Sequence, residues 1–152
     1  MKQSAGILLF RNNKSFPEFF LVHPGGPFWK NKDDGSWSIP KGEFSTDENA
    51  FDAAKREFTE ETGFDLQGAF IPLAPVKLKS GKLVHAWALE KDVDASAVSS
   101  NVFEIEWPPK SGKIKSFPEI DKAGWFAAAE ALRLINASQA GFINELVLLL
   151  DR

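Results

Sequence analysis

The sequence predicts a mixed α/β (α+β) sandwich. Short, apolar, β-prone runs recur through the first two thirds of the chain, whereas residues 45–62 and the last quarter carry apolar residues at helical spacing. Strands and helices follow one another in a non-repeating order, which is typical of a sheet covered by helices. The chain has 152 residues and is 43% hydrophobic, so we expect one domain over residues 1–152 with a substantial core.

Composition excludes several kinds of function. The formal net charge of −3 argues against binding to a nucleic-acid backbone, which requires a dominant basic surface. The absence of cysteine excludes disulfides, thiolate nucleophiles and zinc–thiolate sites. The apolar run at residues 5–10 is too short for a secretion signal or a membrane span. We therefore expect a cytoplasmic protein without a nucleic-acid or membrane partner.

The strands are expected in the following order. Residues 4–10 and 18–23 are apolar and flank a polar stretch, which predicts a β-hairpin or two adjacent strands. Residues 24–37 are rich in Gly and Pro and predict a loop, followed by a short extended piece that ends at Pro40. Residues 69–90 predict two strands around a turn at Ser80 and Gly81, and residues 101–107 predict another strand. A long loop is expected over residues 108–124.

Three helices are expected. The first spans residues 45–62, because Ser45 and Glu48 match a capping box and Gly63 occupies the place of a C-terminal cap. The second spans about residues 127–136. The third begins at a Ser138 cap and carries apolar residues at helical spacing, namely Phe142, Ile143, Leu146, Val147 and Leu150.

The first helix carries an unusual acidic cluster. On a helical wheel Glu57, Glu60 and Glu61 share one sector beside the apolar face, whereas Arg56 falls on the opposite side with other polar residues. Partly desolvated like charges oppose one another's ionisation, and one arginine on the far side cannot neutralise three carboxylates. A hard divalent cation, Mg²⁺ or Mn²⁺, would suit these oxygen ligands. The alternative is an ordinary solvated acidic face.

The spacing around this cluster resembles the Nudix box, Gly-x5-Glu-x7-Arg-Glu-U-x-Glu-Glu-x-Gly-U, in which U is a bulky aliphatic residue. The matching residues, within 42–64, are Gly42, Glu48, Arg56, Glu57, Glu60, Glu61 and Gly63, with Phe58 and Phe64 at the U positions. Residues 4–10, the Trp-x-x-Pro-Lys-Gly entry to the box and the late Glu119-x5-Trp125 pattern are also similar to the family. The resemblance implies an α/β/α sandwich with a central mixed sheet.

The resemblance also implies roles for these residues. Nudix enzymes hydrolyse a nucleoside diphosphate linked to another moiety, using Mg²⁺ or Mn²⁺. Glu57 and Glu61 would be the main metal ligands, together with the carbonyl of Gly42, and Glu60 would be a further ligand or the base that positions water. Arg56 and Glu48 would form a supporting ion pair. Glu119 is the alternative catalytic base.

Lys41, which precedes the box glycine, narrows the range of expected substrates. A lysine at this position is similar to the pattern of the Nudix branch that acts on diadenosine polyphosphates and diphosphoinositol polyphosphates. The alternative is an ordinary exposed lysine in a loop. The negative net charge argues against an inositol polyphosphate. A nucleobase would need an aromatic partner, for which His85, Trp87 and Phe117 are candidates, with core packing as the alternative for Trp87.

We therefore expect a metal-dependent Nudix pyrophosphohydrolase whose substrate is a dinucleoside polyphosphate similar to diadenosine tetraphosphate. One alternative is a nucleoside triphosphate pyrophosphatase of the housecleaning type. The other is a catalytically silent Nudix domain that binds nucleotides. The sequence makes no prediction about oligomeric state.

Overall fold

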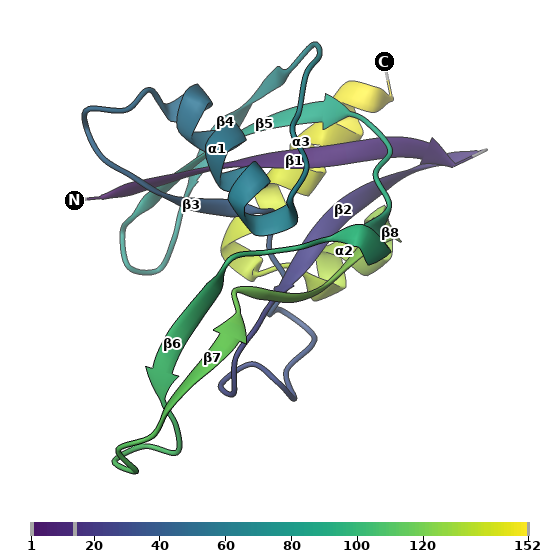
Figure 1. The fold of residues 1–152 in the computed structure, drawn as a ribbon. Coiled ribbons are helices and arrows are strands. Elements are labelled where there is room, and N and C mark those ends of the chain that lie inside the picture. The colour runs from purple at the N-terminus through teal and green to yellow at the C-terminus, as the bar shows by residue number, and fades with distance from the viewer. Residues whose placement is uncertain (1, 14, 152) are drawn as a thin grey trace.

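The computed structural model describes residues 2–13 and 15–151. Its centre is a mixed sheet with the strand order β4-β5-β1-β2-β8, in which β1 also pairs with β3 (Figure 1). Strand β1 runs parallel to β5 and antiparallel to β2 and β3. The strands are β1 (Gln3–Asn13), β2 (Phe16–Pro24), β3 (Lys41–Phe44), β4 (Ile71–Lys77), β5 (Leu83–Glu90) and β8 (Ile120–Ala127).

Helices cover both faces of this sheet. Helix α1 (Ala50–Thr62) lies on one face, and α2 (Ala128–Leu134) and α3 (Ala140–Leu150) lie on the other (Figure 1). Short 3₁₀ turns, η1 (Ala95–Ala97) and η2 (Ala137–Gln139), connect elements, and β6 (Val102–Glu106) and β7 (Ile114–Pro118) form a separate antiparallel ribbon. The predicted α/β class and its central mixed sheet are confirmed.

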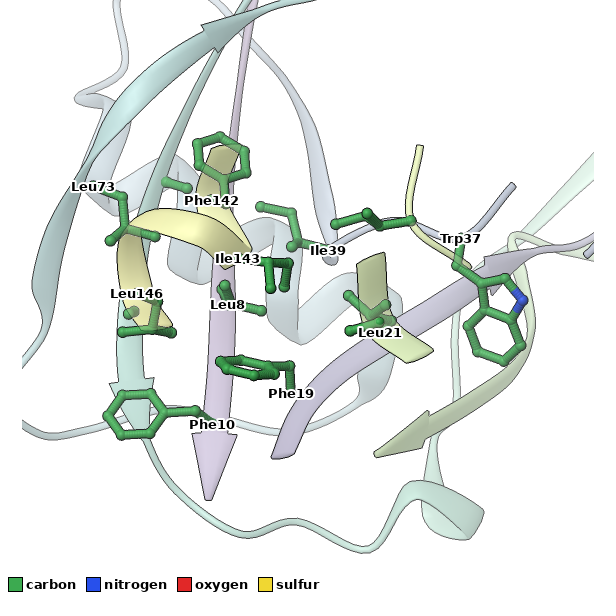
Figure 2. Close-up of a cluster of buried hydrophobic side chains, with 14 of the residues drawn as sticks. Leu8, Phe10, Phe19, Leu21, Trp37, Ile39, Leu73, Phe142, Ile143 and Leu146 are labelled. Atoms are coloured by element: carbon green, nitrogen blue, oxygen red, sulfur yellow. The ribbon is translucent and has the colours of Figure 1, made fainter. Parts of the chain in front are cut away.

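Alternation along β1 explains the two cores. Leu8 and Phe10 point to the face under α3, where they pack with residues such as Phe142 (Figure 2). Ile7 and Leu9 point to the opposite face and belong to the cluster that includes Phe58 of α1. A strand that is buried on both faces reads as a continuous apolar run rather than an alternating one. This is why residues 4–10 look uniformly hydrophobic in the sequence.

The predicted hairpin near the N-terminus is confirmed, because β1 and β2 pair antiparallel with Phe10 opposite Phe19. The two strands predicted within residues 69–90 are also confirmed as β4 and β5, which pair antiparallel. Gly81 in their turn has a φ of +92°, a left-handed conformation that glycine adopts without a steric cost. Helix α2 lies within the predicted range 127–136.

The long loop predicted over residues 108–124 is wrong. Residues 114–118 form β7, which pairs antiparallel with β6, and residues from 120 onwards belong to β8, which pairs with β2. The strand predicted at residues 101–107 is confirmed as β6, in which exposed and half-buried residues alternate. Four of the five residues of β7 are exposed, so this strand has no apolar stripe and hydrophobic periodicity gives no sign of it.

Two of the predicted helix caps are also wrong. The α1 helix begins at Ala50, and the side chain of Asn49 accepts hydrogen bonds from the backbone N–H groups of Phe51 (2.9 Å) and Asp52 (3.2 Å). Ser45 therefore lies outside the helix, in the loop that precedes it. The predicted glycine cap is confirmed, because Gly63 has a φ of +85° and its N–H donates to the carbonyl of Thr59 at 2.8 Å.

At the last helix, Ser138 does not form the cap either. It lies within η2, and its backbone N–H donates to the side chain of Asn136 at 2.9 Å. Helix α3 begins two residues later and still buries the predicted Phe142, Ile143 and Leu146. Within residues 2–13 and 15–151, no helix is both long and apolar enough to cross a membrane.

Candidate active site

The close approach of β3 to α1 forms the centre of the candidate site. Pairing with β1 places Gly42 opposite Ala5, and the backbone of Gly42 then lies directly against the carboxylate of Glu57. A Cβ atom at position 42 would come within 1.9 Å of Glu57 Oε2, which is far inside van der Waals contact. Glycine at this position therefore lets a carboxylate of the helix sit against the strand.

Glu57 is held in a poorly solvated place. Its side chain is 14% exposed. Burial raises the pKa of the Glu57 carboxyl, and the neighbouring charges of Glu60 and Glu119 add to this, whereas the hydrogen bond from Arg56 acts in the opposite direction. A carboxylate in such surroundings is stabilised by a nearby positive charge.

Glu61 is the most strongly perturbed carboxyl group of the site. Burial raises its pKa from 4.5 to about 8, although the nearby charge of Lys41 and a hydrogen bond from the Lys41 backbone favour the ionised form. That hydrogen bond runs from the N–H of Lys41 to Glu61 Oε1 at 3.3 Å. The pKa of Lys41 is in turn lowered, first by burial and then by the charge of Lys82. Strand β3 thus brings a desolvated cation beside a desolvated acid.

Arg56 does not stay on the far side of the helix, and this expectation from the helical wheel is wrong. Its guanidinium donates to both carboxylate oxygens of Glu48 at 2.8 Å, to Glu57 Oε1 at 2.9 Å and to Glu60 at 3.2 Å. The long arginine side chain can reach around the helix, which a wheel of Cα positions ignores. The bonds to Glu48 are the main reason why the pKa of Arg56 is raised further above its ordinary value.

The structure therefore brings the Glu48–Arg56 pair together as the family resemblance implies. Because the helix begins at Ala50, Glu48 belongs to the loop before the helix, and Arg56 ties that loop to the carboxylates of α1. The pKa of Glu48 is lowered, mainly by its hydrogen bonds from Arg56. Glu48 is thus a partner of the arginine and does not cap the helix.

The donor chemistry of the site fits a hard divalent cation. Two desolvated carboxylates contribute to the site: Glu57 lies against the backbone of Gly42, and Glu61 accepts a hydrogen bond from the backbone of Lys41. Such oxygen donors are those that Mg²⁺ and Mn²⁺ prefer. Within the part of the chain that the structure describes, no three carboxylates or imidazoles converge closely enough to form a ready cluster. The guanidinium of Arg56 forms ion pairs with Glu57 and Glu60 and supplies positive charge there.

Glu119 reaches the site from the far end of the sequence. It lies at the junction of β7 and β8 and lines a cavity of about 180 Å³ together with Lys41 and Glu61. Its backbone is fixed on both sides, because its N–H donates to Asn101 at 2.9 Å and its carbonyl accepts from Gly25 at 2.8 Å. The loop carboxylate chosen from the sequence is therefore next to the box helix in space.

His85 and Trp87, by contrast, are not brought to this cavity. Trp87 packs against Phe51 of α1, with ring centroids 5.1 Å apart, so core packing accounts for it. The ring of His85 contacts the side chain of Gln3 and lies 6.1 Å from the ring of Phe44. Neither residue lines the cavity that Lys41, Glu61 and Glu119 share.

Phe117 lies in β7, two residues before Glu119 in the sequence. Its ring is 6.1 Å from that of Phe103, and it lines a larger cavity of about 510 Å³ together with Trp107. Trp107 is not among the candidate residues of the sequence analysis, in which it ends the predicted strand at residues 101–107. A tryptophan followed by prolines in a polar segment was the available signal.

His23 is a second residue that was not recognised as important. It lies near the end of β2 and is fully buried. Its Nδ1 lies 2.7 Å from Asp121 Oδ1, and its Nε2 lies 2.6 Å from the carbonyl oxygen of Lys32. It thus connects β8 to the loop after β2. These partners are far apart in the sequence, so no local pattern reveals the connection.

Comparisons with known proteins agree with this geometry. The profile of the NUDIX domain matches residues 1–146. A C. elegans Ap4A hydrolase, solved as a binary complex, is 18% identical over 98% of each chain, with a TM-score of 0.71. The NUDIX domain of Shewanella oneidensis NrtR, solved with ADP ribose, is 16% identical over 97% of this chain and 87% of its own, with a TM-score of 0.66.

A mutT/nudix family protein from Listeria innocua is 19% identical over 99% of this chain and 94% of its own, with a TM-score of 0.64. At these identities the similar structures show a shared fold. No curated protein sequence matches the chain significantly. Because the NUDIX profile covers almost the whole chain, the protein belongs to the NUDIX family and is a hydrolase of pyrophosphate bonds.

Proposed function

We propose that the protein is a metal-dependent pyrophosphohydrolase whose substrate is a dinucleoside polyphosphate similar to diadenosine tetraphosphate. The observation that carries this proposal is the pair of desolvated carboxylates, Glu57 against Gly42 and Glu61 beside the backbone of Lys41, with Glu119 in the same cavity as Glu61. Burying acids together is unfavourable unless a cation neutralises them, and this cost is typical of a functional site.

The metal would be held by Glu57, Glu61 and the carbonyl of Gly42, with Glu60 as a further ligand. When bound, Mg²⁺ or Mn²⁺ polarises a phosphoryl oxygen and makes a bound water more acidic. Arg56 would keep the helix carboxylates and the loop of Glu48 in a fixed arrangement, since its guanidinium bonds to both. The residues of this chain thereby supply binding and orientation.

Glu119 is favoured over Glu60 as the base that takes the proton of the attacking water. The carboxylate of Glu60 accepts hydrogen bonds from Arg56 at 3.2 Å on both oxygens. The carboxylate of Glu119 has no hydrogen-bond or ion-pair partner among residues 2–13 and 15–151, and it lines the cavity that also contains Glu61. A base must be free to accept a proton near the reacting atom.

The choice of substrate is supported by Lys41 and by the similar structures. Lys41 lines the same cavity as Glu61 and Glu119, so its charge would meet the phosphates of a long polyphosphate chain. The C. elegans protein of similar fold is named an Ap4A hydrolase, and the Shewanella domain binds ADP ribose, which also contains a pyrophosphate link. A nucleotide is therefore the expected small-molecule partner.

A substrate panel with Mg²⁺ or Mn²⁺ and identification of the products tests the proposal. We expect release of ATP from diadenosine tetraphosphate. Cleavage of nucleoside triphosphates to a monophosphate and pyrophosphate would instead identify a housecleaning pyrophosphatase, and turnover of neither substrate class would refute the proposed function.

The Glu60→Gln variant tests the assignment of the site in the same assay. We expect turnover to fall by about two orders of magnitude or more, with an unchanged far-ultraviolet circular dichroism spectrum. Asp52→Asn is the matched control, because Asp52 is an exposed carboxylate of the same helix that takes no part in the cluster. Activity of Glu60→Gln equal to that of Asp52→Asn would contradict the metal-site assignment.

A further inference from the structure

A second cavity lies directly beside the proposed active site. It has a volume of about 510 Å³ and is enclosed by the β6–β7 ribbon and the loop that follows β2, which lie side by side below the main sheet in Figure 1. The residues that line it and matter here are Lys30, Trp107, Lys115, Phe117, Pro118 and Asp121. We refer to these residues as the aromatic cleft.

The aromatic surface around the cleft is larger than the fold requires. Phe28 and Trp29 in the loop are 56% and 40% exposed, although they are large apolar side chains. Trp107 meets Phe28 edge to face with ring centroids 5.4 Å apart, and Phe117 lies beside Phe103. None of them belongs to the clusters of buried residues that form the two cores. Aromatic surface that is left partly exposed in this way can stack on a flat ligand.

The charge of the cleft is positive, in contrast to the net charge of −3 of the chain. Lys30 and Lys115 are both exposed, and in the described part of the molecule neither forms an ion pair within 4.0 Å. The acidic residue of the cleft, Asp121, is already bonded to His23 at 2.7 Å. The two free lysines therefore favour an anionic ligand such as a phosphate.

The aromatic cleft and the active-site cavity share one wall. Pro118 and Asp121 face the aromatic cleft, whereas Glu119 and Ile120, between them in the sequence, line the cavity that contains Lys41 and Glu61. The segment 118–121 thus contributes residues to both cavities, and a ligand in the cleft lies next to the segment that carries the proposed base. A nucleotide that spans both cavities would place its phosphates next to the carboxylates of α1.

The walls of the cleft are held in place before any ligand binds. His23 contacts both Asp121 of β8 and the carbonyl of Lys32 in the loop. A Cβ atom on Gly26 would lie 2.7 Å from Cζ of Phe103, so the ring of this β6 residue packs closely on the loop backbone. A preformed cleft loses less conformational entropy when it binds a ligand.

We propose that the aromatic cleft binds one nucleoside monophosphate end of the substrate, with the base stacked on Trp107 and Phe117 and the phosphate beside Lys30 and Lys115. This inference rests on the proposed function for the identity of the substrate. The cleft presents aromatic faces rather than side-chain amides that would read the edge of a base. The site would therefore select for the presence of a base more than for its identity.

Isothermal titration calorimetry of the full chain with Mg²⁺ tests this proposal, using AMP and ribose 5-phosphate as probes. The two probes share the sugar and the phosphate and differ in the base. Trp107→Ala should weaken AMP binding about tenfold and leave ribose 5-phosphate binding within about twofold. Lys115→Gln should weaken the binding of both probes by up to about fivefold. Phe16→Ala and Lys79→Gln, exposed residues that do not line the cleft, are the controls and should bind as the wild type does.

The proposal is overturned if Trp107→Ala binds AMP as tightly as the wild type, if it loses both probes equally, or if the wild-type protein does not bind AMP. Because calorimetry requires no turnover, this result is separate from the substrate panel. Binding of AMP that depends on Trp107, without hydrolysis of any substrate, would support the cleft and refute the proposed reaction. Hydrolysis of diadenosine tetraphosphate, together with normal AMP binding by Trp107→Ala, would support the proposed reaction and refute the role of the cleft.

Discussion

Replacing Glu61 by Gln should remove a loss of folding stability that the metal-free protein undergoes as the pH rises to neutral and alkaline values. Burial raises the pKa of Glu61 from 4.5 to about 8, so the folded chain holds this proton more tightly than the unfolded chain does. The stability that this proton contributes is fully present below about pH 4.5 and is lost as the pH rises towards 8. Gln imitates the protonated acid and can still accept the hydrogen bond from the Lys41 backbone.

The size of the effect follows from the difference between the two pKa values. Each pKa unit corresponds to about 1.4 kcal/mol, and most of the shift falls between about pH 5.5 and pH 8.5. The free energy of unfolding of the wild type should therefore fall by about 3 kcal/mol more than that of Glu61→Gln across this interval. For a chain of this size the difference corresponds to roughly 6 to 12 °C in the melting temperature.

Thermal or urea unfolding in EDTA at these two pH values measures the effect. The difference between the wild type and Glu61→Gln is the relevant quantity, because groups that are not coupled to Glu61 contribute equally in both proteins. The same variant should lose turnover by orders of magnitude when Mg²⁺ is present, since Gln is a poor ligand for the cation. Parallel pH dependences of stability in the two proteins would refute the claim that Glu61 is a desolvated acid.

Two further substitutions test the geometry of the site. Gly42→Ala would place a methyl group 1.9 Å from Glu57 Oε2, so kcat/KM should fall at least about 100-fold. Gly141→Ala in α3 is the control: its Cβ would lie 3.5 Å from its nearest neighbour, so this variant should keep full activity and have a slightly higher melting temperature. Equal activity of the two variants would contradict the role of Gly42. Glu119→Gln should lower kcat by about 100-fold to 1,000-fold with little change in KM, and steady-state kinetics with near-wild-type kcat would transfer the role of base to Glu60.

Sequence reasoning succeeded where local spacing decides the structure. The positions of Glu57, Glu60 and Glu61 relative to Gly63 follow from helical geometry and from a glycine cap that needs a left-handed conformation. The apolar strands were also recognisable, because burial on both faces of the sheet demands an unbroken hydrophobic run. These features depend on residues that are close together in the sequence.

The predictions from the sequence are wrong where the structure depends on contacts between distant residues or on the reach of long side chains. Asn49 rather than Ser45 caps the helix, and Glu48, which a capping box would pair with the helix start, bonds instead to Arg56 eight residues along the chain. The strand β7 is stabilised by pairing with β6 rather than by an apolar face. Glu119 is recognisable as a candidate base from its motif, but the cavity that it shares with Glu61 forms only when the chain folds.

The pairing of β1 has a consequence for the order in which the protein can fold. The first residues of β1, Gln3–Gly6, hold β3, and with it Gly42, while Ser4–Phe10 pair in parallel with residues of β5 that lie 80 positions further along the chain. Closing such a long loop is slow compared with the formation of a helix. Helix α1 can therefore form early in refolding without a working site around it. Recovery of hydrolytic activity after dilution from denaturant should follow completion of the sheet and lag behind recovery of the helical circular dichroism signal.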